Sequence, residues 1–164
     1  MSTENIKNPI EKSVEYLNKA YQFQIKGQFE EAILHYKLSL ELHPTAEAHT
    51  FLGWTYSFLG DIDKAIEECK KAVTIDPDYG NPYNDIGSYL IQKGLHDEAM
   101  PWLELAINSK KYENVHFAHF NLGRVLELKG LWFEAIDEYK YAINLSPDYL
   151  LAKQNLNRLQ GLLN

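Results

Sequence analysis

Histidine and cysteine are the side chains here that could bind a transition metal, because imidazole nitrogen and thiolate sulfur are common zinc ligands. The 164 residues include six histidines and one cysteine. His116 and His119 stand three apart, close enough to share one face of a helix, but no third ligand of suitable type recurs near them. Cys69 lies in an apolar pattern that is typical of a helix core. The sequence therefore predicts no metal site.

Catalytic residue patterns are also missing from the sequence. Acidic neighbours such as Asp97 and Glu98 could transfer protons, but nothing in the sequence around them would raise their pKa. The chain contains no nucleophile elbow, phosphate-binding loop, zinc signature or dinucleotide fingerprint. We therefore expect a protein that is not an enzyme and that needs no cofactor.

The charge balance argues against nucleic acid and membrane partners. The chain carries 16 Lys and Arg residues against 23 Asp and Glu residues, a formal net charge of -7. Such an acidic field repels phosphate backbones and anionic lipid head groups. Neither a signal peptide nor a membrane span is expected, because no apolar run is long enough. A single cysteine cannot form an internal disulfide, which favours a reducing compartment, the cytoplasm.

Small residues recur at a nearly constant spacing. The structural elements that this spacing indicates must position any functional side chain. Glycines recur at spacings of 33, 34 and 36 residues, and an alanine follows each glycine after five residues. These pairs are Gly27 and Ala32, Gly60 and Ala65, Gly94 and Ala99, and Gly130 and Ala135. Seven residues beyond the alanines come further small residues, at Ser39, Ala72, Ala106 and Ala142. A fixed period of this length indicates an array of structural repeats.

Each repeat is expected to form two helices. In residues 52–59 apolar side chains recur at helical spacing, Gly60 interrupts them, and residues 66–73 resume the pattern. The recurring small residues would let two antiparallel helices approach closely. Pro77 and Pro147 follow the second helix of their repeats, where a missing N–H does no harm. The pattern therefore predicts helix, turn, helix in every repeat.

These residues, in this order and at a period near 34, resemble the tetratricopeptide repeat family. The resemblance implies an all-α fold, a right-handed α-solenoid of four tetratricopeptide helical hairpins with a C-terminal capping helix. On this register residues 1–12 form an N-terminal extension and residues 13–149 form four repeats. The repeats cover 13–45, 46–79, 80–115 and 116–149, and residues 150–164 form the capping helix.

The chain departs from the family pattern in two ways. The tryptophan that is usual at the fourth position of a repeat is replaced by Tyr16, His49, Tyr83 and His119. The third repeat lacks the terminal proline and gains two residues within 109–113, so we expect a longer loop there.

The resemblance also implies where a partner binds, because the first helices of such repeats line an inner groove that usually holds the ligand. Aromatic anchors for apolar side chains would be Tyr21, Phe51, Trp54, Phe58, Phe117 and Phe120. Polar residues between them, whose side chains could bond an extended backbone, include Asn84, Asp85, Ser88 and Asn121, and Arg124 lies on the same stripe. Some of these rings, Phe51 and Phe58 above all, could instead pack against a neighbouring repeat.

One well-known subsite of the family is absent. A carboxylate clamp for acidic chaperone tails needs lysines and asparagines at positions that here hold Leu17, Tyr21, Phe51, Asn81 and Asp85. We therefore expect no tight binding of such tails.

The sequence as a whole favours a non-catalytic protein–protein interaction module, an adaptor or scaffold. It would act as a monomer and bind a protein or peptide segment, extended or helical, in its groove. Two alternatives stay open. A bacterial secretion-type chaperone would dimerise and hold an unstructured client segment. A regulatory subunit would dock a GTPase or kinase through its loop edges, including the 109–115 insertion.

Overall fold

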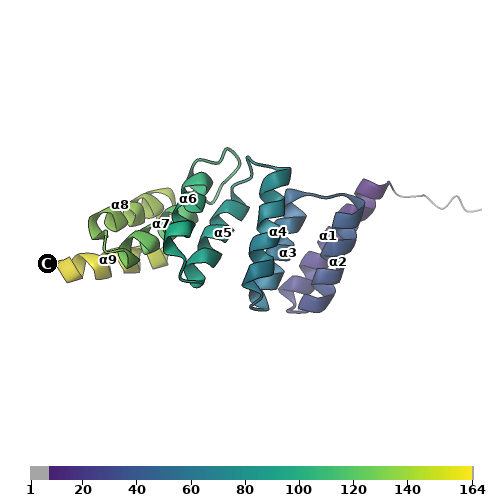
Figure 1. The fold of residues 1–164 in the computed structure, drawn as a ribbon, viewed down its shortest axis with the longest axis horizontal. Helices are drawn as coiled ribbons and strands as arrows, with labels where there is room; N and C mark the ends of the chain where they lie inside the picture. Colours follow the sequence, from purple (N-terminus) through teal and green to yellow (C-terminus); the bar gives the residue numbers. More distant parts are fainter. Residues whose placement is uncertain (1–7, 164) are drawn as a thin grey trace, which may run out of the picture. The chain divides into compact units, whose positions relative to one another are not determined.

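The computed structural model describes residues 8–163, and this part of the chain is built from helices (Figure 1). It divides into two compact units, which meet in sequence between Asp76 and Pro77. Within the described residues the helices form four consecutive hairpins and a closing helix. The predicted all-α class is therefore confirmed. Residues 1–7, which make up most of the predicted N-terminal extension, and residue 164 lie outside the described residues.

Unit 1 consists of two hairpins, and its helices are α1 (Pro9–Ile25), α2 (Phe29–Leu42), α3 (Ala46–Phe58) and α4 (Ile62–Ile75). Each helix packs against its hairpin partner, and α2 and α1 both contact α3. The first helix begins four residues before the predicted first repeat, because the Asn8 side chain accepts a hydrogen bond from the backbone N–H of Ile10. Pro9 favours the same start, since the first helical position needs no N–H donor.

Unit 2 contains two further hairpins and the closing helix, with helices α5 (Asn81–Gln92), α6 (His96–Ile107), α7 (Val115–Leu128), α8 (Trp132–Leu145) and α9 (Leu150–Leu163). The helices pack in chain order, α5 with α6 through to α8 with α9, and α5 also contacts α7. We call α1, α3, α5 and α7 the leading helices, because each is the first of its hairpin. Ala152 and Leu159 are the buried residues of α9.

All four hairpin turns hold a glycine whose backbone adopts a positive φ, between 73° and 80°. These are the four periodic glycines of the sequence, and side chains rarely tolerate that conformation. The turn at Gly27 is typical: its N–H bonds the carbonyl of Gln24, and the N–H of Gln28 bonds the carbonyl of Phe23. This is the Schellman arrangement, which satisfies the last carbonyls of a helix. The periodic glycines are therefore needed to reverse the chain.

The other periodic small residues lie where paired helices cross. The alanines and the serine at these sites are buried, and Gly53, Gly87 and Gly123 are buried as well. A methyl group on Gly123 would lie 2.7 Å from Cε1 of Tyr139 on the partner helix. The hairpins thus pack closely because one side of each crossing carries almost no side chain.

The loop 108–114 contains the two-residue insertion and joins α6 to α7. The N–H of Lys111 bonds the carbonyl of Asp78, and the N–H of Gly80 bonds the carbonyl of Lys111. Tyr112 is buried directly over Gly80. The insertion is therefore fixed onto the segment that leads into α5.

Candidate functional site

Three of the predicted aromatic residues meet on the leading helices of unit 1. The ring centroid of Tyr21 on α1 lies 5.8 Å from that of Phe51 on α3, and Phe51 lies 4.9 Å from Trp54. Tyr21 is 43% exposed, and Phe51 and Trp54 are half-buried. We call these three residues the aromatic patch. Large, partly exposed rings of this kind provide contact area for the apolar side chains of a partner.

The aromatic patch rests on a hydrogen-bonded base. Phe51 also lies 6.2 Å from the ring of Tyr36, a fully buried residue of α2. The Tyr36 hydroxyl donates to Oε1 of Gln24 at 2.6 Å, and Thr55 donates to the same oxygen at 3.0 Å. Burial raises the pKa of Tyr36, so its hydroxyl stays neutral and keeps donating. Helices α1, α2 and α3 are therefore tied together beneath the patch.

Phe58, the fourth predicted anchor in unit 1, lies at the end of α3. Its ring stacks on Phe29 of α2, with centroids 5.6 Å apart, and it is 61% exposed. Phe29 follows the turn at Gly27, and Phe58 precedes the turn at Gly60. Phe58 therefore lies at the edge of unit 1 that carries the hairpin turns.

In unit 2 three predicted polar residues form one hydrogen-bonded chain. The side-chain nitrogen of Asn121 on α7 donates to Oδ1 of Asn84 on α5 at 3.0 Å. Nη1 of Arg124 donates to Oδ1 of Asn121 at 3.2 Å. Both asparagines are buried. They therefore orient Arg124 and are not an open polar belt for a peptide backbone.

Asp85 and Ser88 lie further along α5 and are half-buried. Burial is the main reason that the pKa of Tyr112 is raised, and the negative charge of Asp85 adds to it. The Asp85 carboxylate therefore lies within electrostatic range of Tyr112 in the inserted loop.

The two predicted phenylalanines of α7 differ in exposure. Phe117 is exposed and packs edge-on against Tyr149, with centroids 5.4 Å apart. Phe120 is only 7% exposed and lies between Tyr139 and Tyr149. His116 joins this group through Phe117 and Tyr149, and burial lowers its pKa. Phe117 can meet a partner, whereas Phe120 supports its neighbours from within.

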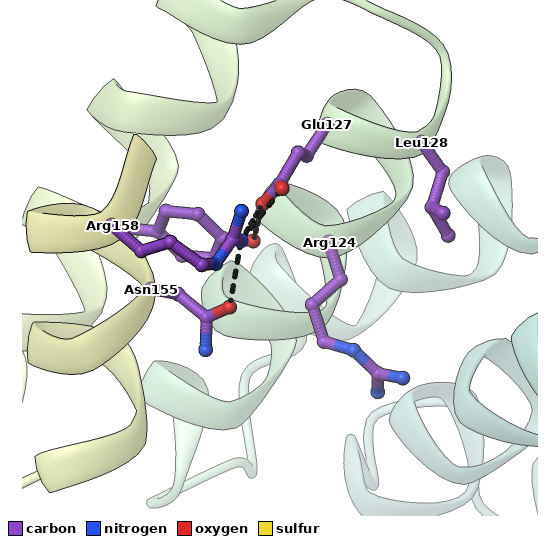
Figure 2. A pocket seen from close by; sticks show the side chains of 6 residues that line it. Arg124, Glu127, Leu128, Asn155 and Arg158 are labelled. Carbon is purple, nitrogen blue, oxygen red and sulfur yellow. Dashed lines mark hydrogen bonds and ion pairs between the residues drawn. The ribbon is translucent and has the colours of Figure 1, made fainter. Parts of the chain in front are cut away.

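A pocket of about 200 Å³ opens beside this group in unit 2 (Figure 2). It is lined by Arg124, Glu127, Leu128, Tyr139, Asn155 and Arg158. Nη2 of Arg158 bonds both carboxylate oxygens of Glu127, at 2.6 and 2.7 Å, and the Tyr139 hydroxyl donates to Oε2 of Glu127 at 2.9 Å. Burial, and then the bond to Glu127, raise the pKa of Tyr139. The Glu127 carboxylate in the pocket wall is therefore held by two partners, Arg158 and Tyr139.

Of the pocket residues, Arg124, Glu127 and Leu128 lie on the inward stripe that the repeat register predicts for α7, and Arg124 is one of the predicted binding residues. Tyr149, Asn155 and Arg158 lie at or beyond the end of the fourth repeat, where the period no longer predicts which side chains face α7. Their only signal in the sequence is that Arg158 stands one repeat length after Arg124. The predicted residues thus gather at two separate places, the aromatic patch in unit 1 and the surroundings of Arg124 in unit 2. A single groove that joins them stays a prediction.

The histidines that suggested a metal site have other partners. Nδ1 of His119 lies 2.6 Å from Oε2 of Glu138, and His49 makes the equivalent contact with Glu68. In residues 8–163 no group of three or more His, Cys, Asp and Glu side chains could hold a metal ion. In the same residues no helix is long and apolar enough to span a membrane.

Comparison with known proteins agrees with this geometry. The tetratricopeptide repeat family model matches residues 46–79 and 81–112. Small glutamine-rich tetratricopeptide repeat-containing protein 2 of Mycosarcoma maydis is 31% identical over 96 residues, which cover 54% of this chain and 27% of that protein. This chain spans 27% or less of the length of the curated relatives that it matches.

Solved structures are similar over most of the chain. The crystal structure of MamA protein has a TM-score of 0.76 and 29% identity, and the match covers 91% of this chain and 81% of that chain. Pseudomonas aeruginosa pilF has a TM-score of 0.86 and 22% identity, with coverage of 93% and 69%. The repeated hairpins and the periodic small residues agree with these matches: residues 46–79 and 81–112 carry tetratricopeptide repeats, and the chain shares the fold of these solved structures.

Proposed function

We propose that this chain is a non-catalytic adaptor whose leading helices hold a segment of a partner protein. Tetratricopeptide arrays are protein–protein interaction modules, and the further step concerns the binding surface. The observation that carries it is the aromatic patch: three rings in contact, partly exposed, on a base that is itself hydrogen-bonded. A rigid aromatic surface loses little entropy on binding, so its contact area contributes efficiently to affinity.

The partner segment should present apolar side chains to the aromatic patch. Val14 and Ile25 on α1 are exposed and stand seven residues before and four residues after Tyr21, so helical spacing continues the apolar surface along the same face. Residues 13–76 carry more acidic than basic side chains, and basic residues that flank the apolar ones would gain favourable electrostatics. We expect a peptide with aromatic or aliphatic anchors and nearby lysine or arginine.

The same proposal includes a monomer that works in the cytoplasm and does not bind nucleic acid. Support comes from the acidic net charge of -7 and from a single cysteine, which is buried. Light scattering should report the mass of one chain. A stable dimer would instead favour the secretion-chaperone function.

A second candidate function uses the inserted loop. A hollow of about 560 Å³ lies between this loop and the start of α5, lined by Tyr79, Asn81, Lys110, Lys111, Tyr112, Glu113 and Asn114. Because the loop is fixed by backbone bonds to Asp78 and Gly80, it presents a defined shape. This hollow favours a regulatory subunit that docks a second protein through its loop edge.

The aromatic patch can be tested without knowing the natural partner. Peptides would be selected from a random library displayed on phage, and their affinity for the purified chain measured by fluorescence anisotropy. Tyr21→Ala should weaken the selected peptides about tenfold or more. The matched control is Tyr141→Ala, because Tyr141 is also a half-exposed tyrosine, at 55%, but lies on α8.

Two results would count against the proposal. One is unchanged affinity in the Tyr21→Ala variant while its helical circular dichroism is intact. The other is equal weakening by Tyr141→Ala, which would move the binding surface away from the leading helices.

A further inference from the structure

The chain contains only two arginines, Arg124 and Arg158, and both line the same pocket in unit 2 (Figure 2). They stand one repeat length apart, Arg124 on α7 and Arg158 on α9. The other fourteen basic side chains are lysines. Arginine differs from lysine because its planar guanidinium donates parallel hydrogen bonds to a carboxylate or phosphate.

The two arginines differ in the partners of their guanidinium groups. Arg158 forms an ion pair with Glu127 through the two short bonds described above, and it also donates a hydrogen bond to Oδ1 of Asn155 at 3.1 Å. The Tyr139 hydroxyl donates to the same Glu127 carboxylate. The negative charge of Glu127 is therefore matched inside the pocket wall.

Arg124 has no such carboxylate partner among the described residues. Its hydrogen bond goes to the neutral oxygen of Asn121, and its guanidinium carbon lies 5.9 Å from the ring centroid of Phe120. Asn121 is itself fixed by its hydrogen bond to Asn84, so these two asparagines hold the Arg124 guanidinium in position. Figure 2 shows it directed away from the Glu127–Arg158 pair. With two arginines and one carboxylate, the pocket carries a net positive charge in a chain whose net charge is -7.

The size of the pocket indicates what enters it. About 200 Å³ is less than the roughly 300 to 1,000 Å³ of a typical small-molecule site, and it suits one side chain. Leu128 also lines the pocket, is 60% exposed and offers an apolar contact. A ligand that satisfies both features is an acidic side chain next to an aliphatic one on a polypeptide.

We propose that Arg124 binds the carboxylate of an aspartate or glutamate in a partner segment, with Leu128 contacting the neighbouring apolar residue. This inference rests on the proposed function, because it names one chemical feature of the segment that the leading helices hold. It adds an acidic position to the partner at unit 2.

The test uses two capped dipeptides, N-acetyl-leucyl-glutamate amide and N-acetyl-leucyl-glutamine amide, titrated into isotope-labelled protein. The side-chain Nε–Hε resonance of Arg124 is followed by NMR. The glutamate dipeptide should shift it saturably, and the glutamine dipeptide should bind about tenfold more weakly. Added salt should weaken the glutamate response, because the contact is a charge pair.

Matched variants assign the effect to Arg124. Arg124→Gln should abolish the difference between the dipeptides at the neighbouring amides of α7, and Arg124→Lys should restore only part of it. Lys153→Gln removes one positive charge from an exposed site on α9 and should change nothing. An intact helical spectrum for each variant separates loss of binding from loss of folding.

Three outcomes would overturn the proposal: equal shifts with both dipeptides, a preference that survives in Arg124→Gln, or tighter binding of the corresponding phosphoserine dipeptide. Failure of the aromatic patch test would leave this readout unaffected, because the dipeptides are too short to need unit 1. The two proposals can therefore fail independently.

Discussion

Asn121 and Asn84 form a buried hydrogen bond between two leading helices, with Nδ2 of Asn121 lying 3.0 Å from Oδ1 of Asn84. The bond joins α7 to α5, which belong to successive hairpins. It also leaves the Asn121 oxygen directed toward Arg124. One amide therefore holds two helices together and sets the position of a charged side chain.

Replacing Asn121 by alanine should lower the free energy of unfolding by about 1 to 3 kcal/mol, because Asn84 then keeps a buried acceptor without its donor. Urea denaturation followed by circular dichroism measures the change. Asn157→Ala, at an exposed position of α9, is the control and should stay within about 0.5 kcal/mol of the parent. If the bond matters, Asn84→Ala combined with Asn121→Ala should cost less than the two single changes together.

Gly123 gives a prediction about helix crossing. An added methyl group would lie 2.7 Å from Cε1 of Tyr139, whose ring is buried and whose hydroxyl is bonded to Glu127. Because that ring cannot move aside easily, Gly123→Ala should cost about 1 to 3 kcal/mol of stability. Gly161→Ala places the same methyl group in open space on α9 and should stabilise the helix by about 0.5 to 1 kcal/mol. Equal effects of the two substitutions on the urea midpoint would contradict the packing argument.

The hairpins can be predicted from sequence because their determinants are local and repeated. A glycine with positive φ stands in every hairpin turn, and a small residue stands at every crossing within a hairpin, so four copies of one pattern reinforce each other. The residues of the partner-binding stripe can be predicted from the sequence only in part. Periodicity gives the face on which Tyr21 and Phe120 lie, but it does not reveal that one is 43% exposed and the other 7%.

The pocket in unit 2 could not be predicted in the same way. It depends on how α9 packs on the last hairpin, and the repeat pattern ends before α9 begins. The ion pair between Arg158 and Glu127 joins residues 31 positions apart, on helices whose relative rotation no local rule determines. The burial of Tyr112 likewise follows from a loop that interrupts the period.

Glu68 gives a pH-dependent prediction. Burial by itself would raise the pKa of Glu68, but hydrogen bonds from His49 and Lys71 outweigh it and hold the pKa below its ordinary value of 4.5. A carboxyl group with a lowered folded pKa stabilises the fold when ionised, so its contribution is present above about pH 4.5 and is lost as the pH falls. Glu68→Gln should therefore reduce stability by about 1 kcal/mol near neutral pH and flatten its decline in acid.

The neighbouring residue supplies the control for this experiment. Glu67 also pairs with Lys71, at 2.9 Å, but its side chain is far more exposed than that of Glu68. Exposed pairs contribute little, so Glu67→Gln should leave the stability profile between pH 3 and 7 almost unchanged. A steep acid decline that survives in Glu68→Gln would show that other carboxyl groups cause it.

Gly80 tests whether the inserted loop is held by packing. Its backbone has a φ of -78°, so no special conformation requires glycine there. An added methyl group would, however, overlap with Cβ of Tyr112 and lie 2.9 Å from Cβ of Ser109. Gly80→Ala should therefore push the loop away and weaken the bond from the Lys111 N–H to the Asp78 carbonyl. Hydrogen exchange should then be faster at Lys111, whereas Gly94→Ala, which strains a turn with a φ of 76° in open space, should leave Lys111 protected.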